Sequence, residues 1–226
     1  MNKLLVSVLI ILAALFILGL YLLSEMTGGT SFKERYASID KLTFSVGEGS
    51  ILKQELRILM SYGNRSVEIQ RVNRTVRVDG FSWPTYHLCP VNETAQVPCY
   101  DAPFSLIAMP KELLGVDSIE LPFNVGRGRN RISLKYEGIT NIDMPWGQHP
   151  VVNYTNQTAG YPQPNINTTT KFYFDTTEGY MVRIEVVITD GNTTSTAIFQ
   201  LMDVPKLNGP LEVNKPEKWN WGSPGG

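Results

Sequence analysis

The chain has 226 residues, 42% of them hydrophobic, and its 20 basic and 21 acidic side chains leave a formal net charge of −1. This balance excludes the strong positive field by which proteins attract nucleic acid or an anionic lipid surface. We therefore expect no nucleic-acid partner. The length suits one globular domain of ordinary size with short attachments.

The first element is an uncharged, mostly aliphatic run over residues 4–23. A helix of twenty residues rises about 30 Å, which matches the hydrocarbon core of a bilayer and satisfies every backbone group internally. We expect a transmembrane helix here, with residues 1–3 as a cytoplasmic start and membrane lipid as the partner of residues 4–23.

A cleaved secretory signal is the alternative, because Lys3 supplies a positive start and Thr27-Gly28-Gly29 offers small residues for a peptidase. The apolar run exceeds the usual signal core of about 7–15 residues, and no Ala-x-Ala follows it, which favours an uncleaved signal anchor. Both interpretations send the rest of the chain across the membrane. Residues 24–35 are small and polar at first and predict a short tether.

Seven Asn-x-Ser/Thr sequons occur where 15 asparagines and 32 Ser or Thr residues predict about two by chance. Because sugar is attached outside the cytoplasm, they place the domain after the anchor on the extracellular side, whereas the Lys and Arg residues flanking the span leave its orientation undecided. The acceptor residues are Asn64, Asn73, Asn92, Asn153, Asn156, Asn167 and Asn192.

The two cysteines, Cys89 and Cys99, flank a stretch from Pro90 to Pro98 that reads as a loop. In an oxidising compartment they would form a disulfide and contribute roughly 2–3 kcal/mol by restricting the unfolded chain. Two free thiols would be the expectation only in a reducing cytosol.

Residues 36–204 are dominated by alternation of apolar and polar residues, which is the period of half-buried strands. Turns at Gly63-Asn64, Asn73-Arg74 and Asp190-Gly191 separate several of these runs. We therefore predict an all-β ectodomain of some nine strands, folded as a β-sandwich that is immunoglobulin-like or a similar antiparallel Greek key. The expected strands cover residues 42–46, 56–62, 67–69, 76–78, 119–125, 132–136, 172–174, 182–188 and 195–204.

Four further segments fall outside this pattern. Pro110–Leu114 predicts a short helix with proline in its first turn. Gly80–Pro110 and Thr140–Thr170 read as long irregular segments, interpreted as surface insertions rather than binding loops. Residues 205–226 predict an extended tail rich in Pro and Gly, whose Trp219 and Trp221 either dock on the domain or engage a neighbour.

Few residues suggest chemistry. His87-Leu88-Cys89 resembles a pair of metal ligands, but a zinc or copper site needs three or four. Arg127, Arg129 and Arg131 alternate and suit an anion or partner contact, or simply a solvated hairpin turn. Compact catalytic signatures are missing from the sequence, so we expect no enzyme, no cofactor and no bound metal.

These features predict a non-enzymatic, N-glycosylated interaction or scaffold protein on the cell surface, as one subunit of an envelope assembly. In its dense sequons and simple β-domain the chain resembles surface proteins of archaea, a likeness of style that includes no diagnostic motif. Two alternatives stay open. One is a secreted filament subunit that donates a strand after leader cleavage. The other is an accessory subunit of a membrane enzyme, packed through its helix.

Overall fold

The computed structural model describes residues 30–63, 65–91, 98–122, 131–159, 166–217 and 219. The predicted membrane span at residues 4–23 lies outside these ranges. Within them, no helix has both the length and the apolar character that a bilayer crossing requires.

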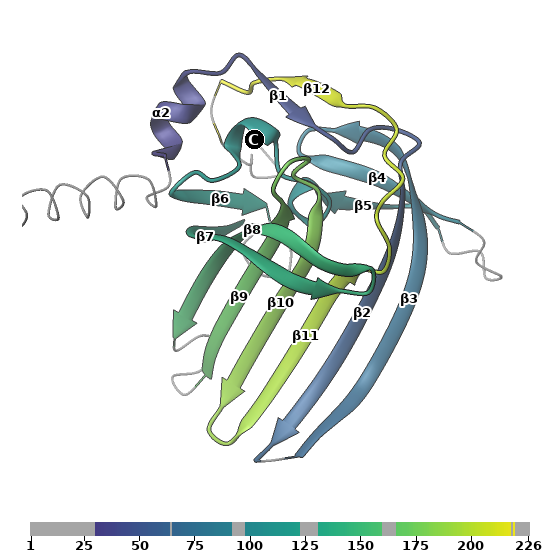
Figure 1. Ribbon diagram of the computed structural model, residues 1–226, viewed down its shortest axis with the longest axis vertical. Helices are drawn as coiled ribbons and strands as arrows, with labels where there is room; N and C mark the ends of the chain where they lie inside the picture. Colours follow the sequence, from purple (N-terminus) through teal and green to yellow (C-terminus); the bar gives the residue numbers. More distant parts are fainter. Residues whose placement is uncertain are drawn as a thin grey trace, which may run out of the picture.

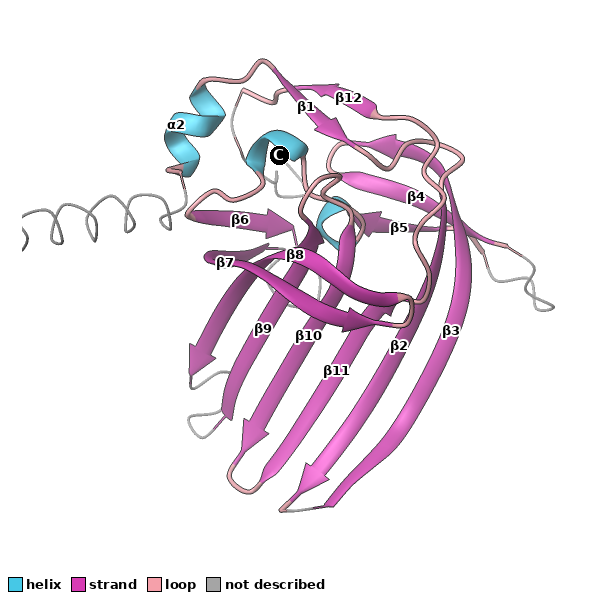
Figure 2. Ribbon diagram, viewed as in Figure 1, coloured by secondary structure: helices cyan, strands magenta, loops and turns pink. Residues whose placement is uncertain are grey.

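Strands make up most of the described chain (Figure 2). The short helices are α2 (Phe32–Ala37) and the 3₁₀ helices η1 (Phe104–Leu106) and η2 (Lys111–Leu113). The strands are β1 (Lys41–Phe44), β2 (Ile51–Tyr62), β3 (Arg65–Ser82), β4 (Thr85–Pro90), β5 (Tyr100–Pro103), β6 (Ser118–Pro122), β7 (Arg131–Met144), β8 (Gly147–Ala159), β9 (Ile166–Asp175), β10 (Met181–Asp190), β11 (Thr193–Leu201) and β12 (Leu211–Asn214).

Ten of these strands form one antiparallel sheet in the order β5-β4-β3-β2-β11-β10-β9-β8-β7-β6, while β1 and β12 pair separately. The all-β class is confirmed. The arrangement differs from the predicted Greek-key sandwich, because two meanders, β2 to β5 and β6 to β11, join at the β2–β11 pairing into a single sheet. Local hairpins therefore account for all of its pairings except that one.

The core is closed by the segment that connects the two edge strands, β5 and β6. Its side chains Phe104, Ile107, Met109, Leu113 and Val116 are all buried. The Met109 amide donates to the Gly179 carbonyl at 2.7 Å, and the Met181 amide donates to the Ile107 carbonyl at 2.8 Å. Gly179 has φ +72° and an added Cβ would lie 2.6 Å from the Met109 carbonyl oxygen, so glycine is required at this contact.

Both segments predicted to be irregular contain strands, and the second is largely strand. Gly80–Pro110 contains the end of β3, β4 and β5, and then enters the core. Thr140–Thr170 contains most of the β7–β8 hairpin and the start of β9. The expected turn at Asn73-Arg74 is also wrong, because β3 runs through it with Asn73 opposite Glu55. Polar residues on half-exposed strands hid the alternation in these places. The short helix predicted at Pro110–Leu114 is present as η2.

The domain is longer at both ends than the predicted 36–204. Thr30 bridges to Val116, and the Phe32 amide donates to Asp117, so the end of the supposed tether packs on the domain. At the other end, β12 pairs with β1 over the top of the fold (Figure 1). The tail beyond residue 204 is thus part of the structure as far as it is described.

Candidate functional site

The lower half of the sheet in Figure 1, formed by the ends of β2, β3, β8, β9, β10 and β11, extends beyond the core. Residues paired across neighbouring strands lie on the same face of a sheet. The register Val72–Leu56–Phe199–Ile184–Phe172 therefore marks one face, and its last two residues are buried in the core. The same face continues past the core and is called here the distal apolar face. Its apolar residues are Leu56, Ile58, Met60, Tyr62, Val67, Val72, Val186, Ile188, Ala197 and Phe199, with the polar residues Gln70, Thr193 and Ser195 among them.

The outer rows of the distal apolar face are open to solvent. The exposed fraction is 46% for Met60, 68% for Tyr62, 59% for Val67, 41% for Val72 and 40% for Ile188. Scattered exposed apolar residues are ordinary, but a contiguous patch marks an interaction surface. Four of these five side chains lie on the neighbouring strands β2 and β3, and Ile188 lies across Ser195 of β11 from Met60, so we take this face as the candidate functional site.

The other side of the same strands, the outer face, is charged and hydrogen-bonded. Glu55 is almost fully buried there, and its carboxylate accepts from the Gln200 side chain at 3.1 Å and lies 3.4 Å from Arg71 Nε. Glu68 bridges Arg57 at 3.1 Å and Arg71 at 3.3 Å. The outer face thus satisfies its own charges, in contrast to the open distal apolar face.

The described sequons are distributed unevenly between the two faces. Asn73 and Asn167 are exposed and pair with outer-face residues, and Asn192 is exposed in the turn between β10 and β11. Asn156, on the same side as the distal apolar face, is half-buried, and its amide nitrogen donates to the Ser133 carbonyl at 2.7 Å. Sugars on the exposed acceptors would therefore leave the distal apolar face uncovered.

Of the three remaining sites, only Asn153 is described. Asn153 is half-buried in β8, and its amide oxygen has no hydrogen-bond partner among the described residues. Asn64 and Asn92 lie outside the described residues. Of the five acceptors that the structure describes, the exposed Asn73, Asn167 and Asn192 have the side-chain access that a glycan needs.

A histidine cluster lies where the β7–β8 hairpin meets the turn after β9. His149 Nε2 lies 2.9 Å from Asp175 Oδ2, and the Trp146 indole N–H donates to His149 Nδ1 at 3.4 Å. Asp175 also accepts from the amides of Thr177 and Glu178. Both ring nitrogens are thus engaged in holding the hairpin to the turn, which is a structural role.

Tyr180 completes this cluster, with its hydroxyl 3.4 Å from His149 Nε2. Burial, followed by the negative charge of Asp175, raises the pKa of Tyr180 far above its ordinary value. The hydroxyl therefore stays protonated at neutral pH. A protonated phenol beside an imidazole with no free nitrogen does not provide an activated nucleophile.

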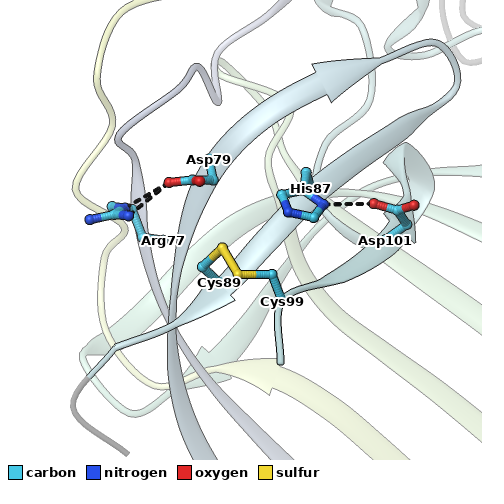
Figure 3. The surroundings of a disulfide bond; sticks show 6 residues. All are labelled: Arg77, Asp79, His87, Cys89, Cys99 and Asp101. Atoms are coloured by element: carbon cyan, nitrogen blue, oxygen red, sulfur yellow. Dashed lines mark hydrogen bonds and ion pairs between the residues drawn. A yellow bond between two sulfur atoms is a disulfide. The ribbon is translucent and has the colours of Figure 1, made fainter. Parts of the chain in front are cut away.

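Cys89 and Cys99 form the predicted disulfide between β4 and the start of β5 (Figure 3). His87 lies close to both sulfurs, but its Nδ1 faces Asp101 at 2.9 Å. Because both sulfurs are bonded to each other, neither is a thiolate that could ligate a metal. His87 therefore lies beside the sulfurs because β4 and β5 pair as a hairpin, which also places Asp101 opposite His87.

Removing this disulfide should destabilise the domain. We expect the double variant Cys89→Ser and Cys99→Ser to lose about 2–3 kcal/mol of unfolding free energy, since a closed ring of this size restricts the unfolded chain by that amount. Urea unfolding followed by circular dichroism measures the difference. Reductant should lower the stability of the wild type to that of the variant and leave the variant unchanged; equal sensitivity of both would contradict this account.

Of the predicted contact residues, only Trp219 has a described side chain. It packs against Phe32, Tyr36, Trp83 and Phe104 with ring centroids 5.3–6.0 Å apart, and its indole N–H donates to the Glu120 carbonyl at 2.8 Å. Trp219 therefore docks on its own domain. An open cavity of about 260 Å³ beside it is lined by Phe32, Ser118, Ile119, Glu120, Ser133 and Trp219.

The other predicted contacts are not brought to this site. Arg127, Arg129 and Trp221 lie outside the described residues. Arg131 starts β7, where its backbone pairs with Pro122, and its side chain is likewise outside what the structure describes. The structure thus offers no further support for an anion site at these arginines.

Known proteins show little similarity to this chain. No family model and no curated protein matches the chain. One solved structure is similar: a protein of Bacteroides fragilis NCTC 9343, inferred to be exported and described as having a YmcC-like fold, with 12% identity over 71% of this chain and 97% of that chain. Its TM-score is 0.35, and a likeness at that level assigns neither a family nor a function.

The distal apolar face was not identified from the sequence. A strand is correctly predicted by the alternation of Leu56, Ile58, Met60 and Tyr62. The predicted sandwich, however, would cover the apolar side of this strand with a second sheet. A strand pattern reports which side chains share a face, but not whether another layer covers that face. The excess length of β2 and β3 over an ordinary strand is visible only in the structure, because the sequence predicts shorter strands in this region.

Proposed function

We propose that this protein is a non-enzymatic, N-glycosylated surface protein, anchored through residues 4–23, that acts as an interaction or scaffold subunit. The observation that carries the proposal is the distal apolar face, which extends beyond the core with Met60, Tyr62 and Val67 about half or more exposed. A domain normally buries such a face under a second layer. A partner protein would supply that layer here.

The dimensions and chemistry of the face favour an apolar protein surface as its occupant. Four strands about 4.8 Å apart, with four successive residues of each strand pointing to this face, give a footprint of about 500 Å². This matches one side of a specific interface at the small end of the observed range. The formal charges at its margin are Arg65 and Asp190, in the outermost row, and Arg74.

The membrane and glycan parts of the proposal rest on the sequence and on exposure. The uncharged run at residues 4–23 has the length of a bilayer span, and Asn73, Asn167 and Asn192 are exposed acceptors. Their positions on the outer face and in a turn allow glycosylation and partner binding together. A disulfide between Cys89 and Cys99 suits an oxidising compartment.

The test is site-specific photo-cross-linking of the full-length protein in its native membrane. A photoreactive phenylalanine analogue replaces Met60 on the distal apolar face or, as the matched control, its neighbour Ser61 on the outer face. We expect a discrete protein adduct from position 60 at about tenfold the yield from position 61, because only the first side chain would be buried in the contact. Equal yields, or none from either, would overturn the proposal.

Glycopeptide mass spectrometry of the same material tests the remaining part. We expect sugar on Asn73, Asn167 or Asn192, and unmodified Asn153 and Asn156, whose side chains are half-buried. Unmodified asparagine at all seven sequons, together with recovery from the cytosol, would contradict a surface location.

A further inference from the structure

The long strand β3 leaves a free edge beside the distal apolar face. It pairs with β2 from Arg65 to Arg77, but β4 covers its other side only from Val76 to Ser82. Figure 1 shows β3 as the outermost strand of the lower half of the sheet. Among the described residues, the backbone from Arg65 to Arg74 therefore has a strand partner on one side only.

We infer that this edge pairs with the same edge of a second copy, antiparallel, about a twofold axis between Ile69 and Gln70. Free strand edges carry unpaired N–H and C=O groups and readily add another strand. The second copy is favoured because the side chains of this edge complement themselves. The inference uses the strand edge, a different surface from the distal apolar face, and it identifies the partner as this chain.

Charge gives the first argument. In the proposed register Glu68 of each copy lies opposite Arg71 of the other. The contacts of Glu68 with Arg57 and Arg71 of its own copy are thereby extended by two further ion pairs across the axis. Opposite charges in cross-strand pairs stabilise a sheet, and like charges destabilise it. Shifting the register by one or two residues in either direction removes both pairs, because Glu68 then faces Ile69, Gln70, Val72 or Asn73.

Apolar matching gives the second argument. The same register places Val67 opposite Val72 twice, and both side chains lie on the distal apolar face, opposite Met60 and Leu56 respectively. Two β-branched residues on adjacent strands pack well. Pairing would therefore join the distal apolar faces of two copies into one continuous surface of about 1,000 Å².

A bulge in β3 allows the charge pairing and the apolar pairing to occur in the same register. Without it, Glu68 and Arg71 would point to opposite faces, because successive side chains alternate. The register between β2 and β3 shifts between Ile58 and Leu59, so that Glu68 and Arg71 lie together on the outer face, 3.3 Å apart. Residues that lie opposite each other across the proposed axis consequently point to the same side of the sheet, as strand pairing requires.

The unfavourable contacts in the proposed register lie at the two ends of the paired segment. Arg65 lies opposite Arg74 on each side of the dimer, where both are close to solvent and screening weakens the repulsion. Arg74 is also held over the Tyr100 ring, with its guanidinium carbon 5.1 Å from the ring centroid. A glycan on Asn73 would project from the outer face and leave the backbone edge free.

Cysteine cross-linking of the full-length protein in mild detergent tests the register. The two native cysteines are bonded to each other, so the variants Val67→Cys and Val72→Cys each add one reactive thiol. In the proposed dimer, positions 67 and 72 of different copies are opposite each other and within disulfide reach. Identical positions are five residues apart along the strands, about 17 Å, and cannot bond.

We expect a mixture of the two single variants to give about tenfold more covalent dimer under mild oxidation than either variant alone. The variant carrying both cysteines should form the covalent dimer without mixing. Far-ultraviolet circular dichroism verifies that each variant is folded. Light scattering that shows only monomers of the folded wild type, or equal cross-linking of all variants, would overturn the inference. Photo-cross-linking from position 60 to another protein would still leave the proposed function standing.

Discussion

Replacing Phe104 with alanine should lower the free energy of unfolding by about 4 kcal/mol. Phe104 is fully buried where η1 leaves β5, and its ring centroid lies 5.4 Å from those of both Phe44 and Trp83. It also contacts Trp219 of the tail. One side chain therefore holds together β1, the β3–β4 turn, the core segment and the chain end, and its removal leaves a cavity that none of them fills easily.

The matched control is Leu106→Ala in the same 3₁₀ helix, where the side chain is only partly buried. We expect a loss of about 1–2 kcal/mol there, since less apolar surface leaves the core. Chemical denaturation followed by tryptophan fluorescence gives both values. If Phe104→Ala lost no more unfolding free energy than Leu106→Ala, the Phe104 side chain would not be central to the packing of the core.

Alkaline pH should unfold the domain through its buried tyrosines. Tyr86 and Tyr154 are both fully buried; the Tyr86 hydroxyl donates to the Val46 carbonyl at 2.9 Å, and the Tyr154 hydroxyl accepts from the Gly115 amide at 2.9 Å. Burial raises the pKa of both far above the ordinary value near 10, and burial with the charge of Glu185 raises the pKa of Tyr173 to about 12.

The direction of the effect follows from these shifts. Below pH 10 the tyrosines are neutral in the folded and unfolded chains, so stability is unaffected. Above pH 10 the unfolded chain ionises while the fold keeps Tyr86 and Tyr154 neutral, and the two together cost about 2.7 kcal/mol for each pH unit. Since domains have stabilities of about 5–15 kcal/mol, unfolding is expected within a few pH units above 10.

A pH titration that records tyrosinate absorbance and circular dichroism together checks this expectation. Ionisation of the buried tyrosines should coincide with loss of the β signal. Tyr86→Phe should lower the pH slope by about 1.4 kcal/mol per pH unit, whereas Tyr62→Phe, at an exposed ring, should leave it unchanged. Ionisation of these groups with the β signal intact would contradict their burial in the core.

The sequence predicted the local structure well where one face of a strand is buried. The alternation in Leu42–Val46, Phe172–Phe174 and Val182–Ile188 identified β1, β9 and β10, and Pro110 marked the start of η2. It failed at Asn73, where the flanking residues of the strand are exposed on both faces, and between Thr140 and Thr170, where polar residues surround the buried Val151, Val152 and Tyr154 and obscure the period. The disulfide was predictable because the chain has only two cysteines.

By itself, the sequence determined the β class, the Cys89–Cys99 pair and the positions of the sequons, because each depends on residues near one another in the chain. Only the tertiary structure decided that two meanders join at β2 and β11, that Trp219 packs on the core, and that the ends of β2 and β3 extend past it. Those features depend on contacts between distant segments, which local periodicity does not encode. Whether an apolar strand face is covered or left open for a partner is a property of the whole fold.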